Sequence, residues 1–274
     1  MSTTTNSSTN PASSGPNGRS AGETVLQTKV CTIQFGGLIA VNCLEMSVQP
    51  GEIYGLIGPN GAGKTTIFNL LTGVYKPTSG EIYFRGQRID GLKPYEISRR
   101  GVSRTFQNIR LFPSMSVLEN VMTACHRHAR QSLLDAVLRL PKFERDEQEH
   151  RNLSMELLEI FDLARFKDEG GTSLPYGNQR RLEIVRAHAT RPQLLLLDEP
   201  AAGMNPSEQE DLMRLIKQIR DRFGLTILLV EHNMKVVMGV CDRIQVVDYG
   251  KSIALGFPEQ IKNDPKVIEA YLGD

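Results

Sequence analysis

Residues 58–66 read Gly58-Pro59-Asn60-Gly61-Ala62-Gly63-Lys64-Thr65-Thr66, and this stretch decides the fold of the chain. It fits the pattern G-x-x-x-x-G-K-[ST], a loop whose backbone N–H groups surround phosphates. An apolar segment precedes the loop, and the residues after it are predicted to form a helix whose N-terminal dipole faces the phosphates. In such a loop Lys64 neutralises phosphate oxygens and the Thr65 hydroxyl can ligate Mg²⁺. The stretch therefore predicts a site for a nucleoside triphosphate with Mg²⁺.

A second string, residues 194–199, places two carboxylates directly after four leucines. The leucines predict a buried strand whose carboxyl end lies beside the phosphate loop. There Asp198 is expected to bind Mg²⁺ through water. Glu199 would point elsewhere, towards an attacking water, and is the candidate general base or water-positioning residue. Together the two strings predict that the chain binds and hydrolyses a nucleoside triphosphate.

Strands alternate with helices along most of the chain, which predicts an α/β fold with a mainly parallel, covered sheet. Residues 205–208 form a well-defined helix start, with a cap, a proline and an acid in turn. That helix is expected to place four apolar residues inward, Leu212, Leu215, Ile219 and Phe223. Residues 248–251 are predicted to turn a hairpin. Strands are expected at 25–33, 41–48, 52–57, 81–84, 193–198, 225–230 and 243–247, and helices at 64–71, 179–190 and 206–223.

Residues 108–168 differ from the rest because they combine many charges with helical periodicity, and they are predicted to form an inserted helical subdomain. A helix is expected within 152–166, with one buried face that carries Leu153, Leu157, Phe161 and Ala164. A shorter amphipathic stretch lies at 133–140. The histidines of this region, His126, His128 and His150, are not paired as metal ligands and are expected at the surface.

The composition limits the class of protein. The formal net charge is +1, so no general basic field indicates a nucleic-acid partner. No apolar run approaches the length of a membrane span. The four cysteines, at positions 31, 43, 125 and 241, lack metal-ligand spacing and are expected to be buried thiols in a reducing compartment. Residues 1–22 are polar, with hardly an apolar side chain, and are expected to form a disordered tail.

With these motifs in order on one chain, residues 25–274 resemble the ATP-binding subunits of ABC transporters. The resemblance implies a P-loop NTPase domain over 23–274, in which an N-terminal antiparallel β subdomain and the helical insert accompany the mainly parallel sheet. It implies ATP as the nucleotide, with Phe35 stacked on the adenine. It also implies that Gln107 meets Mg²⁺ and the attacking water, and that His232 contacts the γ-phosphate.

The signature segment of this family should read L-S-G-G-Q, and the stretch that resembles it here reads Leu174-Pro175-Tyr176-Gly177-Asn178-Gln179. Pro175 replaces the serine, so one hydroxyl directed at the γ-phosphate is lost. The Gly177 amide and the helix N-terminus remain, and these supply most of the anion site. In the family this segment acts on the ATP of a second subunit in a head-to-tail dimer. The departure therefore bears on how strongly the dimer closes.

Further residues resemble the longer of the two ATPase subunits of branched-chain amino-acid importers. The resemblance rests on residues 35–38, 180–184, 201–206 and 269–273, and on the charged helical insert. It implies two integral-membrane permease subunits and a second, shorter ATPase paralogue as partners, and a periplasmic or extracellular substrate-binding protein as an indirect one. The chain would be peripheral, at the cytoplasmic face of the inner membrane. Importers of other small amides or aliphatic acids carry similar subunits, so the substrate stays open.

Two other functions stay open at this point. One is a non-transport ABC ATPase, although such proteins usually carry two cassettes or a long coiled coil and this chain has one cassette with a short insert. The other is a nucleotide-binding regulatory partner with weak hydrolysis. The altered signature segment favours that function, whereas the presence of both Glu199 and His232 argues against it.

Overall fold

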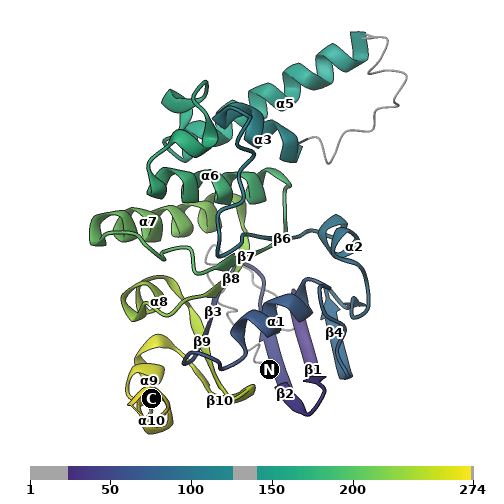
Figure 1. Cartoon of the computed structure of the whole chain (residues 1–274), viewed down its shortest axis with the longest axis vertical. Coiled ribbons are helices and arrows are strands. Elements are labelled where there is room, and N and C mark those ends of the chain that lie inside the picture. The colour runs from purple at the N-terminus through teal and green to yellow at the C-terminus, as the bar shows by residue number, and fades with distance from the viewer. Residues whose placement is uncertain (1–23, 126–140, 273–274) are drawn as a thin grey trace, which may run out of the picture.

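The computed structural model describes residues 24–125 and 141–272, arranged as in Figure 1. Several expectations lie outside these residues, namely the tail at 1–22, the amphipathic stretch at 133–140 and the surface positions of His126 and His128. Within the described ranges, no helix combines the length and apolar character needed to cross a membrane.

A six-stranded sheet forms the centre of the molecule, with the strand order β10–β9–β3–β8–β7–β6. All neighbouring strands are parallel except β9 and β10, which form the predicted hairpin. The central strands β3, β7 and β8 are short, mainly apolar runs because both of their faces are covered. The strands are β3 (Ile53–Ile57), β6 (Val102–Arg104), β7 (Leu194–Asp198), β8 (Thr226–Val230), β9 (Arg243–Asp248) and β10 (Lys251–Gly256).

A second sheet is antiparallel, with the order β2–β1–β4–β5. Its strands are β1 (Leu26–Phe35), β2 (Leu38–Val48), β4 (Ser79–Phe84) and β5 (Gln87–Arg88). Strands β1 and β2 extend further towards the turn that connects them than the sequence predicts, because Phe35 pairs directly with Leu38. The mainly parallel sheet and the N-terminal antiparallel sheet of the expected fold are both confirmed.

Two apolar cores lie on opposite faces of the central sheet, and strands β3, β7 and β8 contribute alternate residues to both. In β3, Ile53 and Ile57 belong to the core under the helices, whereas Tyr54 and Leu56 belong to the core shared with the antiparallel sheet. This alternation follows from the period of two of an extended chain. Because both faces are packed, the carboxyl ends of the central strands are held between two layers, and the phosphate loop begins at the end of β3.

Helices α3 (Val117–Cys125), α5 (Pro141–Ile160) and α6 (Tyr176–Ala189) pack on one another in the upper part of Figure 1. The first two fall within the predicted insert at 108–168, and α6 joins them from beyond it. The boundary of the insert stays a prediction. The remaining α-helices of the described residues are α1 (Lys64–Leu71), α2 (Pro94–Arg99), α7 (Pro206–Phe223), α8 (Met234–Val240), α9 (Pro258–Lys262) and α10 (Pro265–Leu272).

Several local expectations were wrong. The helix predicted within 152–166 ends at Ile160, because Asp162 adopts a left-handed conformation with φ 57°. Phe223 is 40% exposed rather than inward, and its ring packs against His188 at 4.3 Å between centroids. The helix predicted from residue 179 begins three residues earlier, at Tyr176. Of the four cysteines, Cys43 is exposed and only the other three are buried, as free thiols.

Candidate nucleotide-binding site

The phosphate loop connects β3 to α1, and main-chain contacts decide its shape. A Cβ added to Gly58 would lie 2.0 Å from the Val247 carbonyl oxygen, and one added to Gly63 would lie 2.6 Å from the Ala40 oxygen. Gly63 also has a positive φ of 97°. Glycine is required at both positions because the backbone of β9 and that of β2 approach the loop too closely for any side chain.

Helix α1 begins at Lys64 without a side-chain cap and without an acid in its first turn. Its N-terminal N–H groups are therefore available to an anion, as a phosphate site requires. The Lys64 ammonium is buried and donates to the carbonyl oxygens of Gly58 and Pro59 at 2.7 and 2.8 Å. Burial lowers the pKa of Lys64, and the nearby Glu199 carboxylate opposes that change. The lysine is thus held inside the loop that it is predicted to serve.

Three predicted catalytic residues from different elements meet at one carboxylate. The Gln107 side-chain amide donates to Glu199 Oε2 at 2.9 Å, and His232 Nδ1 lies 3.8 Å from the same oxygen. Glu199 follows β7 and His232 follows β8, so the parallel pairing of these strands brings them to one edge. Glu199 has a positive φ of 47°. For a non-glycine residue this conformation costs about 1–3 kcal/mol and is common at functional sites.

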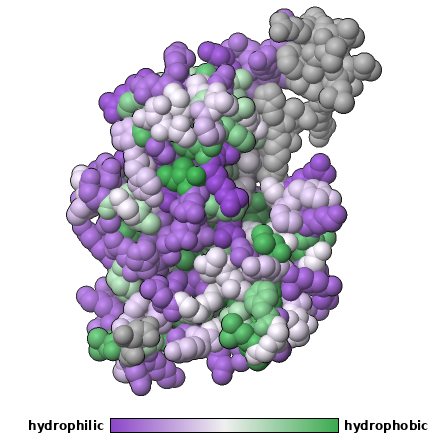
Figure 2. Space-filling view, in the orientation of Figure 1, coloured by the Kyte–Doolittle hydropathy of each residue, from purple (hydrophilic) through white to green (hydrophobic). Residues whose placement is uncertain are grey.

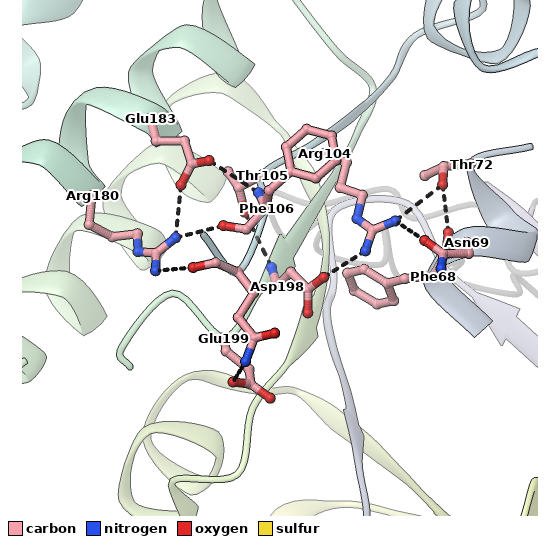
Figure 3. A network of polar contacts seen from close by, with 11 residues as sticks. Phe68, Asn69, Thr72, Arg104, Thr105, Phe106, Arg180, Glu183, Asp198 and Glu199 are labelled. Carbon is pink, nitrogen blue, oxygen red and sulfur yellow. Dashed lines mark hydrogen bonds and ion pairs between the residues drawn. The ribbon is translucent and has the colours of Figure 1, made fainter. Parts of the chain in front are cut away.

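Asp198 ends β7 and forms an ion pair that the sequence analysis did not find. Arg104 Nη2 donates to Asp198 Oδ2 at 2.7 Å, and both side chains are more than 90% buried. The same guanidinium donates to Asn69 of α1 at 2.7 Å and lies over the Phe68 ring, as Figure 3 shows. The Asp198 backbone N–H donates to Thr105 Oγ1 at 3.2 Å. Because 94 residues separate Arg104 from Asp198, no local pattern could reveal the pair.

A cavity of about 350 Å³ collects the three predicted Mg²⁺ ligands. Its lining includes Thr65, Gln107 and Asp198, which bring a hydroxyl, an amide and a carboxylate to one space. These oxygen donors suit a hard cation. Among the described residues, no group of three or more His, Cys, Asp or Glu side chains gathers as a metal centre. The donor set therefore fits Mg²⁺ that takes its other ligands from phosphate and water, as this ion usually does.

Phe35, the predicted adenine contact, ends β1 with its ring 43% exposed. The ring of Tyr75 stands against it edge to face, with centroids 5.1 Å apart. Ala40, five residues further on, contacts the phosphate loop at Gly63. Phe35 is thus an exposed aromatic surface on the strand pair that borders the loop. Tyr75 was missed because the two positions are far apart in the sequence.

The signature segment forms the N-terminus of α6, away from the phosphate loop in sequence and supported by different residues. Pro175 is the N-cap and Tyr176 begins the helix. The Gln179 amide donates to the carbonyl oxygen of Leu174 at 2.8 Å. A Cβ on Gly177 would meet Glu208 Oε1 at 2.8 Å, so α6 begins in close contact with the start of α7. Asn178 is partly exposed at this end of the helix.

A buried carboxylate, Glu231, joins the segment after Glu199 to the predicted His232 site. It accepts from the backbone N–H groups of Ala201, His232 and Asn233 at 2.7, 3.2 and 3.3 Å. Burial raises the pKa of Glu231, and these N–H groups oppose the change. Its position before His232 was visible in the sequence, but the contact with Ala201 depends on the pairing of β7 with β8.

The fold and the loop geometry define a P-loop NTPase, and comparison with known proteins narrows the class. Residues 41–202 match the family described as ABC transporter, and residues 252–274 match that described as branched-chain amino acid ATP-binding cassette transporter. The chain is 50% identical over 242 residues to the high-affinity branched-chain amino acid transport ATP-binding protein LivG of Escherichia coli strain K12. The match covers 88% of this chain and 95% of that protein.

Two solved structures are also similar. The ADP conformation of MJ1267, an ATP-binding cassette of an ABC transporter, is 30% identical with a TM-score of 0.79, over 92% of this chain and 99% of that one. The dimeric post-hydrolysis state of the ATP-binding cassette MJ0796, bound to ADP and Pi, is 25% identical with a TM-score of 0.71, over 85% and 98%. The chain belongs to the ABC transporter family as an ATP-binding subunit, an ABC-type ATPase.

Proposed function

We propose that this subunit hydrolyses Mg²⁺-bound ATP to energise the uptake of branched-chain amino acids by an ABC importer. The observation that carries the hydrolytic part is the meeting of Gln107 and His232 at one oxygen of Glu199, beside the phosphate loop. The similarity to LivG, with the match of residues 252–274, supports the substrate class. Neither of the other functions left open by the sequence has comparable support.

In the proposed mechanism, the backbone N–H groups of the loop and the Lys64 ammonium bind the phosphates. Phe35 stacks on the adenine, and its exposed ring supports this role. Glu199 accepts a proton from the attacking water while the new oxygen–phosphorus bond forms and the bond to the bridging oxygen breaks. Gln107 and His232 orient that carboxylate and the γ-phosphate.

The residues proposed to hold Mg²⁺ are Thr65, Gln107 and Asp198. A bound Mg²⁺ neutralises the charge that develops on the phosphate oxygens. Arg104 donates to Oδ2 of Asp198 and thereby fixes the orientation of this buried carboxylate. Since Asp198 would bind the cation, the Glu199 carboxylate can accept the proton of the attacking water.

A second ATPase subunit is proposed to close against this one head to tail, so that residues 174–179 meet the ATP of that subunit. The support is the exposed N-terminus of α6 and the similarity to the dimeric MJ0796. A shorter paralogue is the proposed partner. The free energy of closure would come from γ-phosphate contacts that exist only in the closed state.

Two permease subunits are the proposed membrane partners, fed by a substrate-binding protein. A groove of about 510 Å³ opens between α2 and helices α3 and α6, with Phe106 and Phe112 in its lining. Figure 2 shows the molecule hollowed on this side, between α2 and the helical layer. The groove includes Phe106, next to Gln107, so an occupant would act directly on the catalytic cluster. We place the subunit peripherally at the cytoplasmic face of the inner membrane.

The test is ATP hydrolysis by this subunit, assembled in lipid with its membrane and ATPase partners. Stimulation by binding protein loaded with leucine is the expected result. Glu199→Gln should reduce turnover at least a hundredfold, roughly 2.7 kcal/mol, while ATP affinity is retained. Hydrolysis that no branched-chain amino acid alters would refute the substrate, and tight ATP binding without hydrolysis in the assembled complex would refute the enzymatic role.

A further inference from the structure

Arg180 is a charged residue that lies entirely inside the molecule. It stands in the second turn of α6, with a side-chain exposure of 0%, and its guanidinium faces the segment that carries Gln107. Its Nη1 donates to Glu183 Oε2 at 2.8 Å and to the Phe106 carbonyl oxygen at 2.7 Å. Its Nη2 donates to the Gln107 carbonyl oxygen at 2.7 Å. A buried charge is tolerated only with such a set of partners.

Glu183, one turn further along α6, completes the contact from the same side. Its Oε1 accepts from the Phe106 backbone N–H at 3.2 Å while its Oε2 accepts from Arg180. Figure 3 shows both side chains pointing from the helix to this segment. The pair therefore binds three backbone groups of two successive residues, the N–H and C=O of Phe106 and the C=O of Gln107. We call this arrangement the α6 clasp.

The clasp holds a piece of chain that has no regular hydrogen-bond ladder of its own. Residues 105–108 follow β6 and belong to neither a strand nor a helix. The Gln107 side chain extends from this piece to Glu199. The position of the Gln107 amide on the proposed catalytic carboxylate is therefore set by the backbone that Arg180 and Glu183 hold.

The other end of the clasp lies in the signature segment. Arg180 Nη2 also donates to the Tyr176 hydroxyl at 3.2 Å, and the guanidinium lies 5.9 Å from the Tyr176 ring centroid. The Tyr176 ring is 45% exposed and faces Gly203, in the turn after Glu199. A group that pressed on the exposed N-terminus of α6 would thus displace Tyr176 and Arg180 together.

We propose that Arg180 and Glu183 are positioning residues that transmit engagement of the signature segment to Gln107 and Glu199 of the same subunit. Hydrolysis at this subunit's site then depends on whether its signature segment has met the ATP of the second subunit. The inference rests on the proposed function, because it requires ATP hydrolysis and a closed dimer. An arginine is needed since its planar fork spans two carbonyl oxygens and a carboxylate at once, which a lysine ammonium cannot do.

The test uses Arg180→Lys in the fully assembled transporter. Lysine keeps the positive charge beside Glu183, so the subunit should fold, but it loses the fork to Phe106 and Gln107. We expect kcat to fall at least tenfold, KM for ATP to change less than twofold, and the Hill coefficient for ATP to fall towards 1. Arg181→Lys is the matched control, because Arg181 lies on the neighbouring position of α6 and pairs only with Asp211 at 3.1 Å among the contacts described. It should keep both kcat and the Hill coefficient.

Tyr176→Phe provides a second variant that keeps the ring on Gly203 and removes only the hydroxyl that Arg180 contacts. It should lower the Hill coefficient with a smaller loss of kcat. The inference would be overturned if Arg180→Lys kept the kcat and the Hill coefficient of the wild-type complex. It would also be overturned if the wild-type complex itself had a Hill coefficient of 1. A parallel loss of ATP affinity and melting temperature, with the Hill coefficient kept, would also overturn it in favour of a merely structural role. A wild-type complex that hydrolyses no ATP would instead refute the proposed function.

Discussion

The phosphate loop and the signature segment both lie at a helix N-terminus, but they are built by different means. The loop is shaped by main chain against main chain, at Gly58 with Val247 and at Gly63 with Ala40. The signature segment is shaped by side chains, through Tyr176, Gln179 and the α6 clasp. A main-chain fit admits only glycine, whereas a network of side chains can be rebuilt around a substitution.

This difference explains where the sequence departs from the family pattern. Residues 58–65 follow the phosphate-loop pattern throughout, while Pro175 and Tyr176 replace a serine and a glycine in the signature segment. Pro175 fits because an N-cap needs no N–H of its own, and its φ of −52° is natural to proline. Tyr176 fits because it faces Gly203, where the absence of a side chain leaves room for the ring.

Beside the phosphate loop, Arg104 is the exception to contacts of main chain with main chain, because its side chain holds Asp198 in place. Arg104→Gln leaves a buried carboxylate without its charge partner, so the free energy of unfolding should fall by about 3–5 kcal/mol. Urea denaturation of the purified subunit measures this. Arg222→Gln is the matched control, since Arg222 pairs with Glu156 at 3.6 Å and at least half of each side chain is exposed, so its denaturation midpoint should not change. If both variants had the same denaturation midpoint, Arg104 would not be needed to stabilise Asp198.

Gly58→Ala tests the main-chain fit directly. The added methyl group would lie 2.0 Å from the Val247 oxygen, so the loop must move, and the dissociation constant for ATP should rise about a hundredfold, roughly 2.7 kcal/mol. Gly61→Ala is the control, because Gly61 has a positive φ but no atom within 4 Å of an added Cβ. Its effect should stay within about tenfold, the usual cost of the left-handed conformation. Equilibrium binding of ATP in both variants decides whether space or conformation matters more.

His188 lies near the C-terminus of α6, the helix that begins with the signature segment. It predicts that the free energy of unfolding depends on pH. Burial lowers its pKa from 6.5 to about 4, with Phe223 packed against the ring. Between these values the unfolded chain binds more protons, so the free energy of unfolding falls as the pH is lowered, by about 2.5 kcal/mol at pH 4.5. His188→Phe should remove that part of the slope between pH 7 and 4.5 in urea denaturation. An unchanged slope would show that His188 is protonated in the folded state.

The smallest expected effect concerns the start of α7, which supports Gly177. Asn205 Oδ1 accepts from the Glu208 backbone N–H at 3.0 Å, and the Asn205 N–H donates to the Glu208 carboxylate at 2.9 Å. Asn205→Ala should cost about 1 kcal/mol of unfolding free energy and weaken ATP-dependent dimerisation, whereas Asn205→Asp keeps the cap and should cost nothing. If Asn205→Ala unfolded and dimerised as the wild-type protein does, the Asn205 cap would not support the signature segment.

Local chemistry made much of the fold predictable. The apolar runs at β3, β7 and β8, the capping box at Asn205 and the glycine after α7 each carry their signal within a few residues. Where a neighbour far away in the sequence decides the outcome, prediction was wrong. Phe223 has an inward periodicity but finds its place at the surface beside His188, and Asp162 ends a helix whose apolar pattern continues.

The sequence alone determined the main-chain part of the site, because a phosphate loop requires glycines at fixed spacing and a strand end requires Asp198 and Glu199 in order. It also indicated Gln107 and His232 through the family resemblance. Only the tertiary structure decided which side chains hold these groups. Arg104 binds Asp198, Arg180 and Glu183 bind the backbone of Gln107 and Phe106 respectively, and Glu231 binds the Ala201 N–H. These contacts join segments 30–94 residues apart. The pairing of parallel strands and the packing of α6 create these contacts, and no short stretch of chain encodes them.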